Sequence, residues 1–193
     1  IQASVYSVSN IIMQSTVNTF GVDAVTGWGL SGRLDAIVWM VTEALGVSIT
    51  TFSAQNFGAR NYERMRKGYH TSLLITVFLV GSLSLFLVLF VEQLAGIFID
   101  DSAVTGYTAK MVHFIAPFYF FYSIVDNTSG AIRGSGESFR PMLLTIVGIC
   151  VFRVIWVYTI FAHFHTIPSL YLLYVFSWKI TAAAEIIYFI HCC

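Results

Sequence analysis

Six long stretches of the chain are nearly free of charged residues, and this pattern predicts six membrane-spanning helices. The stretches cover residues 1–20, 34–52, 68–91, 107–132, 141–161 and 169–190. Each is close to the ~20 residues that a helix rising 1.5 Å per residue needs to cross a bilayer core of ~30 Å. The stretches are too long for barrel strands and lack their two-residue alternation. We therefore predict an all-α, polytopic membrane protein.

The composition supports this prediction and excludes several classes of protein. Of the 193 residues, 57% are hydrophobic and only 10% are charged, whereas a soluble domain carries about 25% charged residues. Ten basic residues balance ten acidic ones, so there is no basic surplus for binding nucleic acid. A water-soluble enzyme is also disfavoured, and the lipid bilayer is the expected surrounding.

Basic residues between the predicted helices indicate how the chain is oriented. The loops after the second and fourth helices hold six of the ten basic residues, namely Arg60, Arg64, Arg66, Lys67, Arg133 and Arg140. The alternate loops carry Asp23, Glu92, Asp100 and Asp101 or, after the fifth helix, two histidines. The positive-inside rule places the Arg-rich loops in the cytoplasm. We therefore predict a multi-pass protein of the cytoplasmic (inner) membrane with both termini cytoplasmic.

Two of the predicted helices carry polar side chains at helical spacing along one face. The first helix has Tyr6, Asn10, Gln14 and Asn18, and the fourth has Tyr119, Tyr122, Asp126 and Ser129. An amide in hydrocarbon is unfavourable unless it meets a partner or water. These faces therefore either form hydrogen bonds between helices or line a substrate cavity, and we favour the cavity.

Asp126 is the most informative charged residue within the predicted spans. It lies seven residues before Arg133, which is about 10 Å along a helix. A carboxylate at that depth can exchange a proton or a cation between alternate conformations. The alternative is a fixed ion pair with Arg133 or Arg153.

Four of the other charges inside the predicted spans carry further expectations. Glu43, Arg153 and Lys179 are near the middle of their helices. Because buried charges usually pair, we expect Glu43 to pair with Arg153 or Lys179, with coupling-ion chemistry at Glu43 as the alternative. Glu185 is nearer the inner boundary. We expect its side chain to extend toward the membrane surface, so that the carboxylate contacts water. Pro117 is expected to kink the fourth helix.

The sequence offers no catalytic or metal-binding constellation. It contains no nucleophile with a partnered base, and its three cysteines have no metal-ligand spacing. We predict neither an enzyme, nor a metal site, nor an organic cofactor.

Two loop segments resemble signatures of the multidrug and toxic compound extrusion (MATE) family. Residues 55–59, which include Gln55, Asn56 and Gly58, are similar to its Gln-Asn-x-Gly-Ala signature. Residues 131–141 are similar to its Leu-Arg-Gly-x-Gly-Asp-x-x-x-Pro segment and include Arg133, Gly134, Gly136 and Pro141. Further matches lie in the first helix and the last two, so the resemblance covers essentially the whole chain.

The resemblance implies a fold and a function. MATE transporters have twelve helices in two related six-helix lobes (6+6) and export cationic or amphipathic compounds in exchange for H+ or Na+. Because this chain has one copy of each loop signature, residues 1–193 are expected to form the C-terminal lobe, with the N-terminal lobe missing. Alternating access would then export small organic cations. Asp126 is expected to be the coupling or substrate carboxylate, although the family's membrane Asp lies one turn further from the Arg-Gly segment.

The remaining expected site residues fall into two sets. Those expected around the cavity are Asn10, Gln14, Asn18, Tyr119, Tyr122 and Glu43. Those expected to shape the inner loops are Gln55, Asn56, Gly58, Arg133, Gly134, Gly136 and Pro141. Two alternatives stay open: a related flippase for lipid-linked oligosaccharides, and a non-transporting half-transporter remnant or scaffold.

Overall fold

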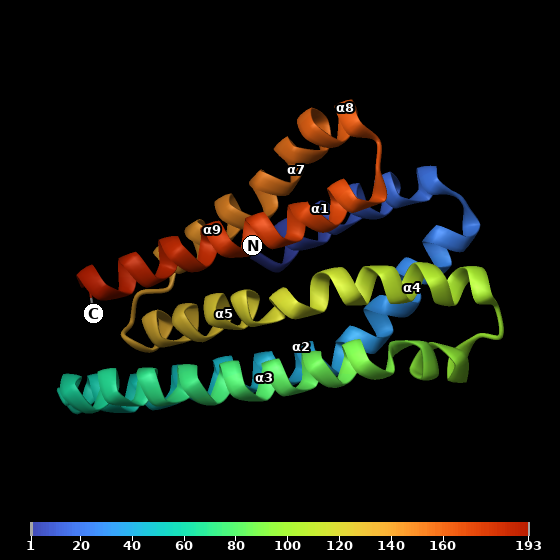
Figure 1. Ribbon diagram of the computed structural model, residues 1–193. Coiled ribbons are helices and arrows are strands. Elements are labelled where there is room, and N and C mark those ends of the chain that lie inside the picture. Colours follow the sequence, from blue (N-terminus) through green and yellow to red (C-terminus); the bar gives the residue numbers. More distant parts are fainter. Residues whose placement is uncertain (1, 193) are drawn as a thin grey trace.

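The computed structural model describes residues 2–192, and all regular structure in that range is helical (Figure 1). Six helical rods follow one another along the chain. They are α1 (Gln2–Val17), α2 (Val22–Gly58), α3 (Tyr62–Phe98), α4 (Ser102–Ile115) continued by α5 (Tyr119–Gly134), α6 to α8 (Phe139–Phe164) and α9 (Ile167–Cys192). Four described segments are long and apolar enough to cross a membrane: Val22–Gly58, Tyr62–Phe98, Phe139–Phe164 and Ile167–His191. The predicted all-α membrane fold is confirmed.

The predicted helix boundaries were wrong around α2 and α3. α2 begins at Val22 instead of Leu34, directly after Gly21, whose positive φ of 93° suits glycine. Residues 54–67 were expected to form a loop, but α2 continues to Gly58 and α3 begins at Tyr62. Asn61 caps α3, because its side chain accepts a hydrogen bond of 3.2 Å from the Arg64 backbone N–H. The uncharged residues 54–58 therefore continue α2, and the charged residues after Asn61 form the first turns of α3.

Two of the rods are locally irregular. A 3-10 turn, η2 (Ala116–Phe118), separates α4 from α5 at Pro117, in agreement with the expected kink. The fifth rod alternates between helix types: α6 (Phe139–Thr145), the π-helical η3 (Ile146–Val151), α7 (Phe152–Trp156), the π-helical η4 (Val157–Phe161) and α8 (Ala162–Phe164). π-helical turns occur frequently at functional sites. Arg153 lies in the short α7 between the two of them.

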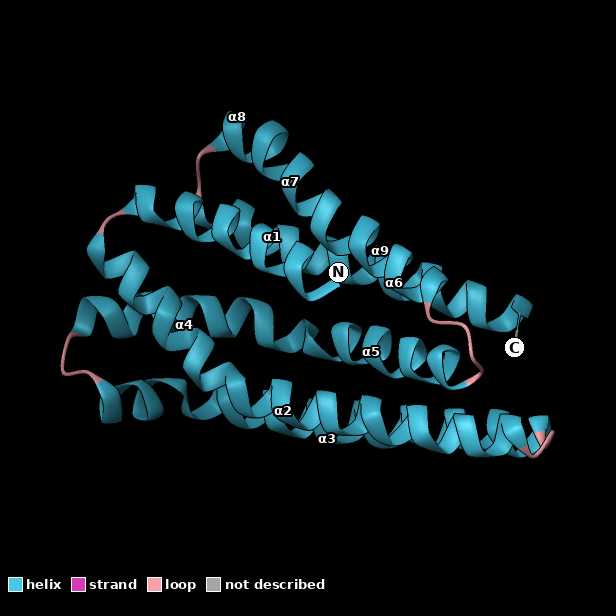
Figure 2. Ribbon diagram, turned by 180° about the vertical axis from the view of Figure 1, so that it is seen from behind, coloured by secondary structure: helices cyan, strands magenta, loops and turns pink. Residues whose placement is uncertain are grey.

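The rods are arranged in two groups with α5 between them. Figures 1 and 2 show α2 and α3 side by side, while α1, α6, α7 and α9 lie on the other side of α5. The largest buried cluster joins these groups and includes Leu34, Val80, Val112, Tyr119 and Trp178. Both views place the α2–α3 and α5–α6 connections at one end of the bundle, as the predicted orientation of the Arg-rich segments requires.

Glycines allow α2 and α5 to approach closely. A Cβ atom on Gly130 would lie 2.6 Å from the Gly46 carbonyl oxygen, and one on Gly134 would lie 2.5 Å from the Thr50 carbonyl oxygen. Gly130 and Gly134 have the four-residue spacing of small residues typical of helix pairs packed tightly in membranes. This contact holds Asp126 of α5 against α2.

Candidate functional site

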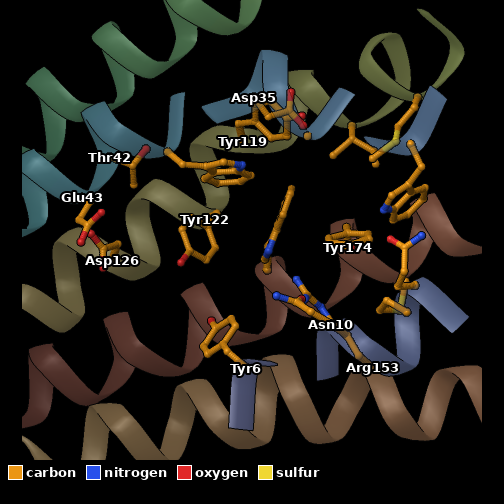
Figure 3. A pocket seen from close by; sticks show the side chains of 18 residues that line it. Tyr6, Asn10, Asp35, Thr42, Glu43, Tyr119, Tyr122, Asp126, Arg153 and Tyr174 are labelled. Atoms are coloured by element: carbon orange, nitrogen blue, oxygen red, sulfur yellow. The ribbon is translucent and has the colours of Figure 1, made fainter. Parts of the chain in front are cut away.

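A cavity of about 580 Å³ lies among α1, α2, α4, α5, α7 and α9 (Figure 3). Six of the seven residues that the sequence placed around a cavity line it: Asn10, Gln14, Glu43, Tyr119, Tyr122 and Asp126. These side chains come from α1, α2 and α5, which are far apart in sequence. Their binding role stays a prediction, but the structure brings them to one place.

Asn18 does not line this cavity. α1 ends at Val17, and Asn18 begins the 3-10 turn η1 (Asn18–Phe20). The α1 side of the cavity ends at Gln14, one turn before Asn18. Its exposed side chain accepts a hydrogen bond of 3.1 Å from the Gln14 amide.

Asp126 is half-buried and forms an ion pair with Arg133. The Asp126 Oδ1 atom lies 3.7 Å from Arg133 Nη2. The Asp126 carboxylate occupies space that a side chain at Gly46 of α2 would need. The fixed ion pair considered from the sequence is therefore present, while the same carboxylate also faces the cavity.

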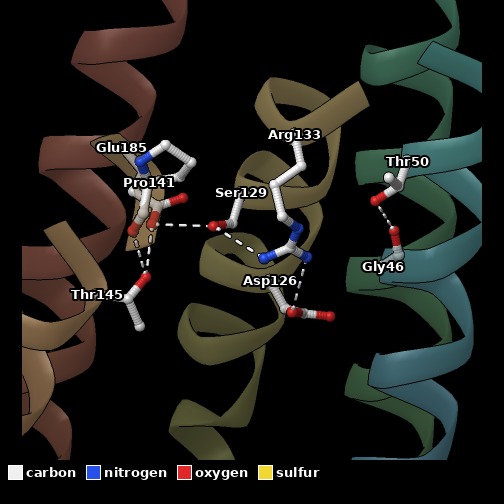
Figure 4. Close-up of polar contacts among 8 residues, drawn as sticks. All are labelled: Gly46, Thr50, Asp126, Ser129, Arg133, Pro141, Thr145 and Glu185. Atoms are coloured by element: carbon white, nitrogen blue, oxygen red, sulfur yellow. Dashed lines mark hydrogen bonds and ion pairs between the residues drawn. The ribbon is translucent and has the colours of Figure 1, made fainter. Parts of the chain in front are cut away.

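A chain of polar contacts leads from this ion pair to Glu185 of α9 (Figure 4). Arg133 donates to Ser129 Oγ at 3.4 Å, and Ser129 donates to Glu185 Oε1 at 3.3 Å. Thr145 donates to the same Glu185 oxygen at 2.9 Å. The expectation that Glu185 reaches water was wrong, because it is 0% exposed between α5, α6 and α9. Its spacing of seven residues from Trp178 places both on the packed face of α9, which was the overlooked signal.

The expected ion pair of Glu43 was also wrong. Among the described residues, Glu43 has no basic group within ion-pairing distance, and it is exposed at the cavity wall. The Lys179 ammonium lies over the rings of Phe118 and Phe121, at 5.2 and 5.3 Å from their centroids. The Arg153 guanidinium lies 4.3 Å from the Tyr174 ring centroid. Aromatic faces, instead of Glu43, therefore contact both cations.

Asp35 lines the cavity and was missed as a site residue. It is only 4% exposed, and its carboxylate interacts electrostatically with the Tyr119 hydroxyl. The predicted second span began at Leu34, which made Asp35 look like a boundary residue. Because α2 begins at Val22, Asp35 instead lies well inside the helix. Its helical spacing to Trp39, Thr42 and Glu43, which also line the cavity, was the available signal.

The predicted inner-loop residues lie at helix ends. Gln55 and Gly58 are in the exposed last turn of α2, and the buried Asn56 donates 2.7 Å to the Phe52 carbonyl. Gly136 has a positive φ of 91° in the α5–α6 connection, and Pro141 is buried in the first turn of α6. Arg133 and Gly134 end α5. Within residues 2–192, His, Cys, Asp and Glu form no group of three or more that could hold a metal ion.

Comparison with known proteins assigns a family model to most of the chain. The MatE model matches residues 1–159. The chain is 27% identical over 158 residues to the probable multidrug resistance protein NorM of Thermotoga maritima, a match covering 80% of this chain and 33% of that protein. It is 28% identical over 119 residues to multidrug and toxin extrusion protein 1 of Homo sapiens, covering 62% and 21% respectively.

Solved structures share the fold. An outward-facing multidrug resistance MATE family transporter of the MOP superfamily superimposes with a TM-score of 0.88 at 19% identity, covering 98% of this chain and 43% of that one. The Vibrio cholerae MATE transporter VcmN in its bent form gives 0.88 at 15% identity with the same coverage. The chain thus spans a third or less of the two curated relatives named above and 43% of these solved chains.

Proposed function

The chain belongs to the MatE family, and from this premise we propose that it is the C-terminal lobe of a secondary active transporter. The transporter would export small organic cations from the cell in exchange for H+ or Na+. The observation that carries the proposal is the charge of the cavity, whose lining holds three carboxylates, Asp35, Glu43 and Asp126, against one guanidinium, Arg153. Seven aromatic residues complete a wall suited to flat cationic compounds. The excess of carboxylates disfavours a lipid-linked oligosaccharide, whose pyrophosphate is anionic.

Alternating access follows from a two-lobe arrangement. We propose that an N-terminal lobe packs against this one and that the two rock about the cavity between them. The likeness in fold to less than half of each solved transporter supports this arrangement. The gathering of Arg60, Arg133 and Arg140 at one end of the bundle supports cytoplasmic placement of that end. An ion that binds one conformation more tightly than the other drives the exchange.

Asp126 is the residue proposed to couple the ion to this motion. At 3.7 Å from Arg133, its carboxylate is held by an ion pair longer than a direct hydrogen bond. A cation or proton arriving from the cavity competes with Arg133 for this carboxylate. Binding therefore weakens a contact at the inner end of α5, while Arg133 still donates to Ser129, which donates in turn to Glu185. Occupancy of the cavity is thereby linked to the packing of α5 on α9.

The test is export of ethidium from cells expressing the full-length protein, with and without a proton or sodium gradient. We expect Asp126→Asn to reduce gradient-driven export by about 5–150-fold, the usual range for loss of coupling between sites. Asp100→Asn, in the exposed α3–α4 connection, is the matched control and should leave export unchanged. Unaltered export and ion dependence in Asp126→Asn would show that the carboxylate has no coupling role.

The two-lobe proposal has its own measurement, the intact mass of the native polypeptide from its membranes. A mass of about twice 21.5 kDa is expected for a six-plus-six transporter. A mass near 21.5 kDa combined with absence of export would contradict the proposal and favour a remnant or scaffold.

A further inference from the structure

Glu185 of α9 carries a carboxyl group that is fully buried outside the cavity. Its side chain is 0% exposed and is not among those that line the cavity. The Oε1 atom accepts hydrogen bonds from Ser129 at 3.3 Å and from Thr145 at 2.9 Å. The buried Oε2 atom has no hydrogen-bond partner in the described part of the chain. Neutral hydroxyls therefore satisfy one oxygen of this group, and the other oxygen is left without a partner.

No cation neutralises this carboxyl group in the described structure. Among residues 2–192, no basic nitrogen lies within ion-pairing distance of Glu185. The charged and titratable groups that interact with it electrostatically are Arg133 and Asp126 of α5 and Tyr69 of α3, while α6 contributes the Thr145 hydroxyl. An ionised carboxylate buried without a counter-charge is far more unfavourable than a single unpaired hydroxyl. The site therefore requires one of two positive partners, a proton on Oε2 or the guanidinium of Arg133.

Arg133 stands between Glu185 and Asp126 (Figure 4). Its Nη2 atom lies 3.7 Å from Asp126 Oδ1, and its Nη1 atom donates to Ser129 Oγ at 3.4 Å. Ser129 donates in turn to Glu185, so one hydroxyl separates the guanidinium from the second carboxyl group. Both contacts of Arg133 are longer than the about 2.7–2.9 Å of a direct charge-assisted hydrogen bond. Arg133 is therefore loosely held, and it has only the Ser129 hydroxyl to pass in order to exchange one carboxyl group for the other.

We propose that Glu185 is the proton-binding site of the transport cycle and that Arg133 moves between Asp126 and Glu185. This inference deepens the proposed function and rests on it. A cation that enters the cavity from the cytoplasm binds Asp126 and displaces the guanidinium. Arg133 then pairs with Glu185, whose O–H bond breaks. The electron pair of that bond stays on the carboxylate oxygen, and the proton passes to water at the inner end of α5.

This exchange keeps the net charge of the network constant. A protonated Glu185 with Arg133 on Asp126 is neutral, and so is an ionised Glu185 with Arg133 beside it and a monovalent cation on Asp126. The Arg133 side chain is 32% exposed, so it connects the buried carboxyl group with solvent. In the outward-facing conformation, a proton that binds Glu185 returns Arg133 to Asp126 and expels the cation. The cycle therefore exports one cation for each proton that enters.

The test counts the protons released when the full-length protein in lipid nanodiscs binds tetraphenylphosphonium, a permanent cation with no exchangeable proton. A pH-sensitive dye in weakly buffered solution follows the release. We expect about one proton per bound cation. The affinity for the cation should rise about tenfold for each unit by which the pH is raised, because binding is linked to the loss of a proton.

Variants assign the released proton to its group. Glu185→Gln keeps an acceptor oxygen for the hydroxyls but has no proton to release, so its cation binding should release close to none and should not depend on pH. Glu185→Asp has a titratable carboxyl group again and should recover part of the release. Glu92→Gln removes an exposed carboxylate of α3. It is the matched control and should release as many protons as the unmodified protein.

Two results would overturn the inference: undiminished proton release in Glu185→Gln, or cation binding without proton release in the unmodified protein. If Glu185→Gln fails to fold, as judged by gel filtration, or fails to bind the cation, infrared difference spectra of the unmodified protein decide. Adding the cation should remove a protonated-carboxyl band that shifts when glutamate is labelled with carbon-13. A band that does not shift assigns the proton to an aspartate and refutes the inference.

The ethidium assay separates this inference from the function on which it rests. Gradient-driven export together with undiminished proton release in Glu185→Gln refutes only the role of Glu185. Absence of export by the unmodified full-length protein refutes the proposed function itself.

Discussion

The contact between α2 and α5 can be tested by adding one methyl group. In Gly130→Ala, the new Cβ would lie 2.6 Å from the Gly46 carbonyl oxygen and 2.9 Å from both Ile49 Cγ2 and Thr50 Oγ1. The first of these atoms belongs to the α2 backbone, so it cannot move aside alone. The two helices must separate, and with them the cavity walls that carry Asp35 and Asp126.

The expected magnitude follows from two opposing effects. Overpacking a well-packed interior destabilises by about 1–3 kcal/mol, while replacing glycine by alanine inside a helix stabilises by about 1 kcal/mol. Gly81→Ala in α3 isolates the second effect, because a Cβ there meets nothing within 4 Å. The difference between the two variants therefore measures overpacking alone. For a chain of this size, each kcal/mol of unfolding free energy shifts the melting temperature by about 2–4 °C. The melting temperature of Gly130→Ala should therefore lie about 2–12 °C below that of Gly81→Ala.

The assay is thermal unfolding in nanodiscs, followed by tryptophan fluorescence. Trp28, Trp39, Trp156 and Trp178 are all at least partly buried, so their emission should report loss of packing. Equal melting temperatures for the two variants would refute the close α2–α5 contact. The same result would also refute the placement of Asp126 against Gly46.

Two further predictions concern buried hydrogen bonds. Asn127→Ala removes the donor of the 2.7 and 3.0 Å bonds to Ser72 and Thr76 of α3. Each interhelical hydrogen bond in a membrane contributes about 0.6 kcal/mol, so the substitution should lower the unfolding free energy by about 1 kcal/mol. Chemical denaturation measures this change, and an unchanged unfolding free energy would contradict the structure. Glu185→Ala leaves the buried Ser129 hydroxyl without its acceptor, whereas the Thr145 hydroxyl keeps the Pro141 carbonyl at 2.8 Å. The variant should therefore be about 1–3 kcal/mol less stable than Glu185→Gln, which retains an acceptor oxygen. Equal unfolding midpoints for the two Glu185 variants would rule out the buried network.

The helices and much of the cavity were predictable from the chain alone. Apolar runs of about 20 residues predict membrane helices because transfer into lipid depends mainly on local composition. Helical spacing placed Asn10 and Gln14 on one face, and Tyr119, Tyr122 and Asp126 on another, and the structure brings both faces to one cavity. Boundaries failed at Val22 and Tyr62, because charged residues at a helix end can extend the helix beyond the apolar core as readily as they end it.

The tertiary structure alone decided which charges are paired and which are exposed. Glu43 was expected to form an ion pair and has no basic partner among the described residues. Glu185 was expected to contact water and is buried. Asp35 was not predicted as a site residue, although it lies in the cavity wall. Helical periodicity assigns a side chain to a face of its own helix, but a partner belongs to another helix. Close packing of α2 on α5, and of α9 on α5 and α6, sets these neighbours. The ionic character of the cavity is therefore a property of the assembled bundle, whereas its helices are a property of the sequence.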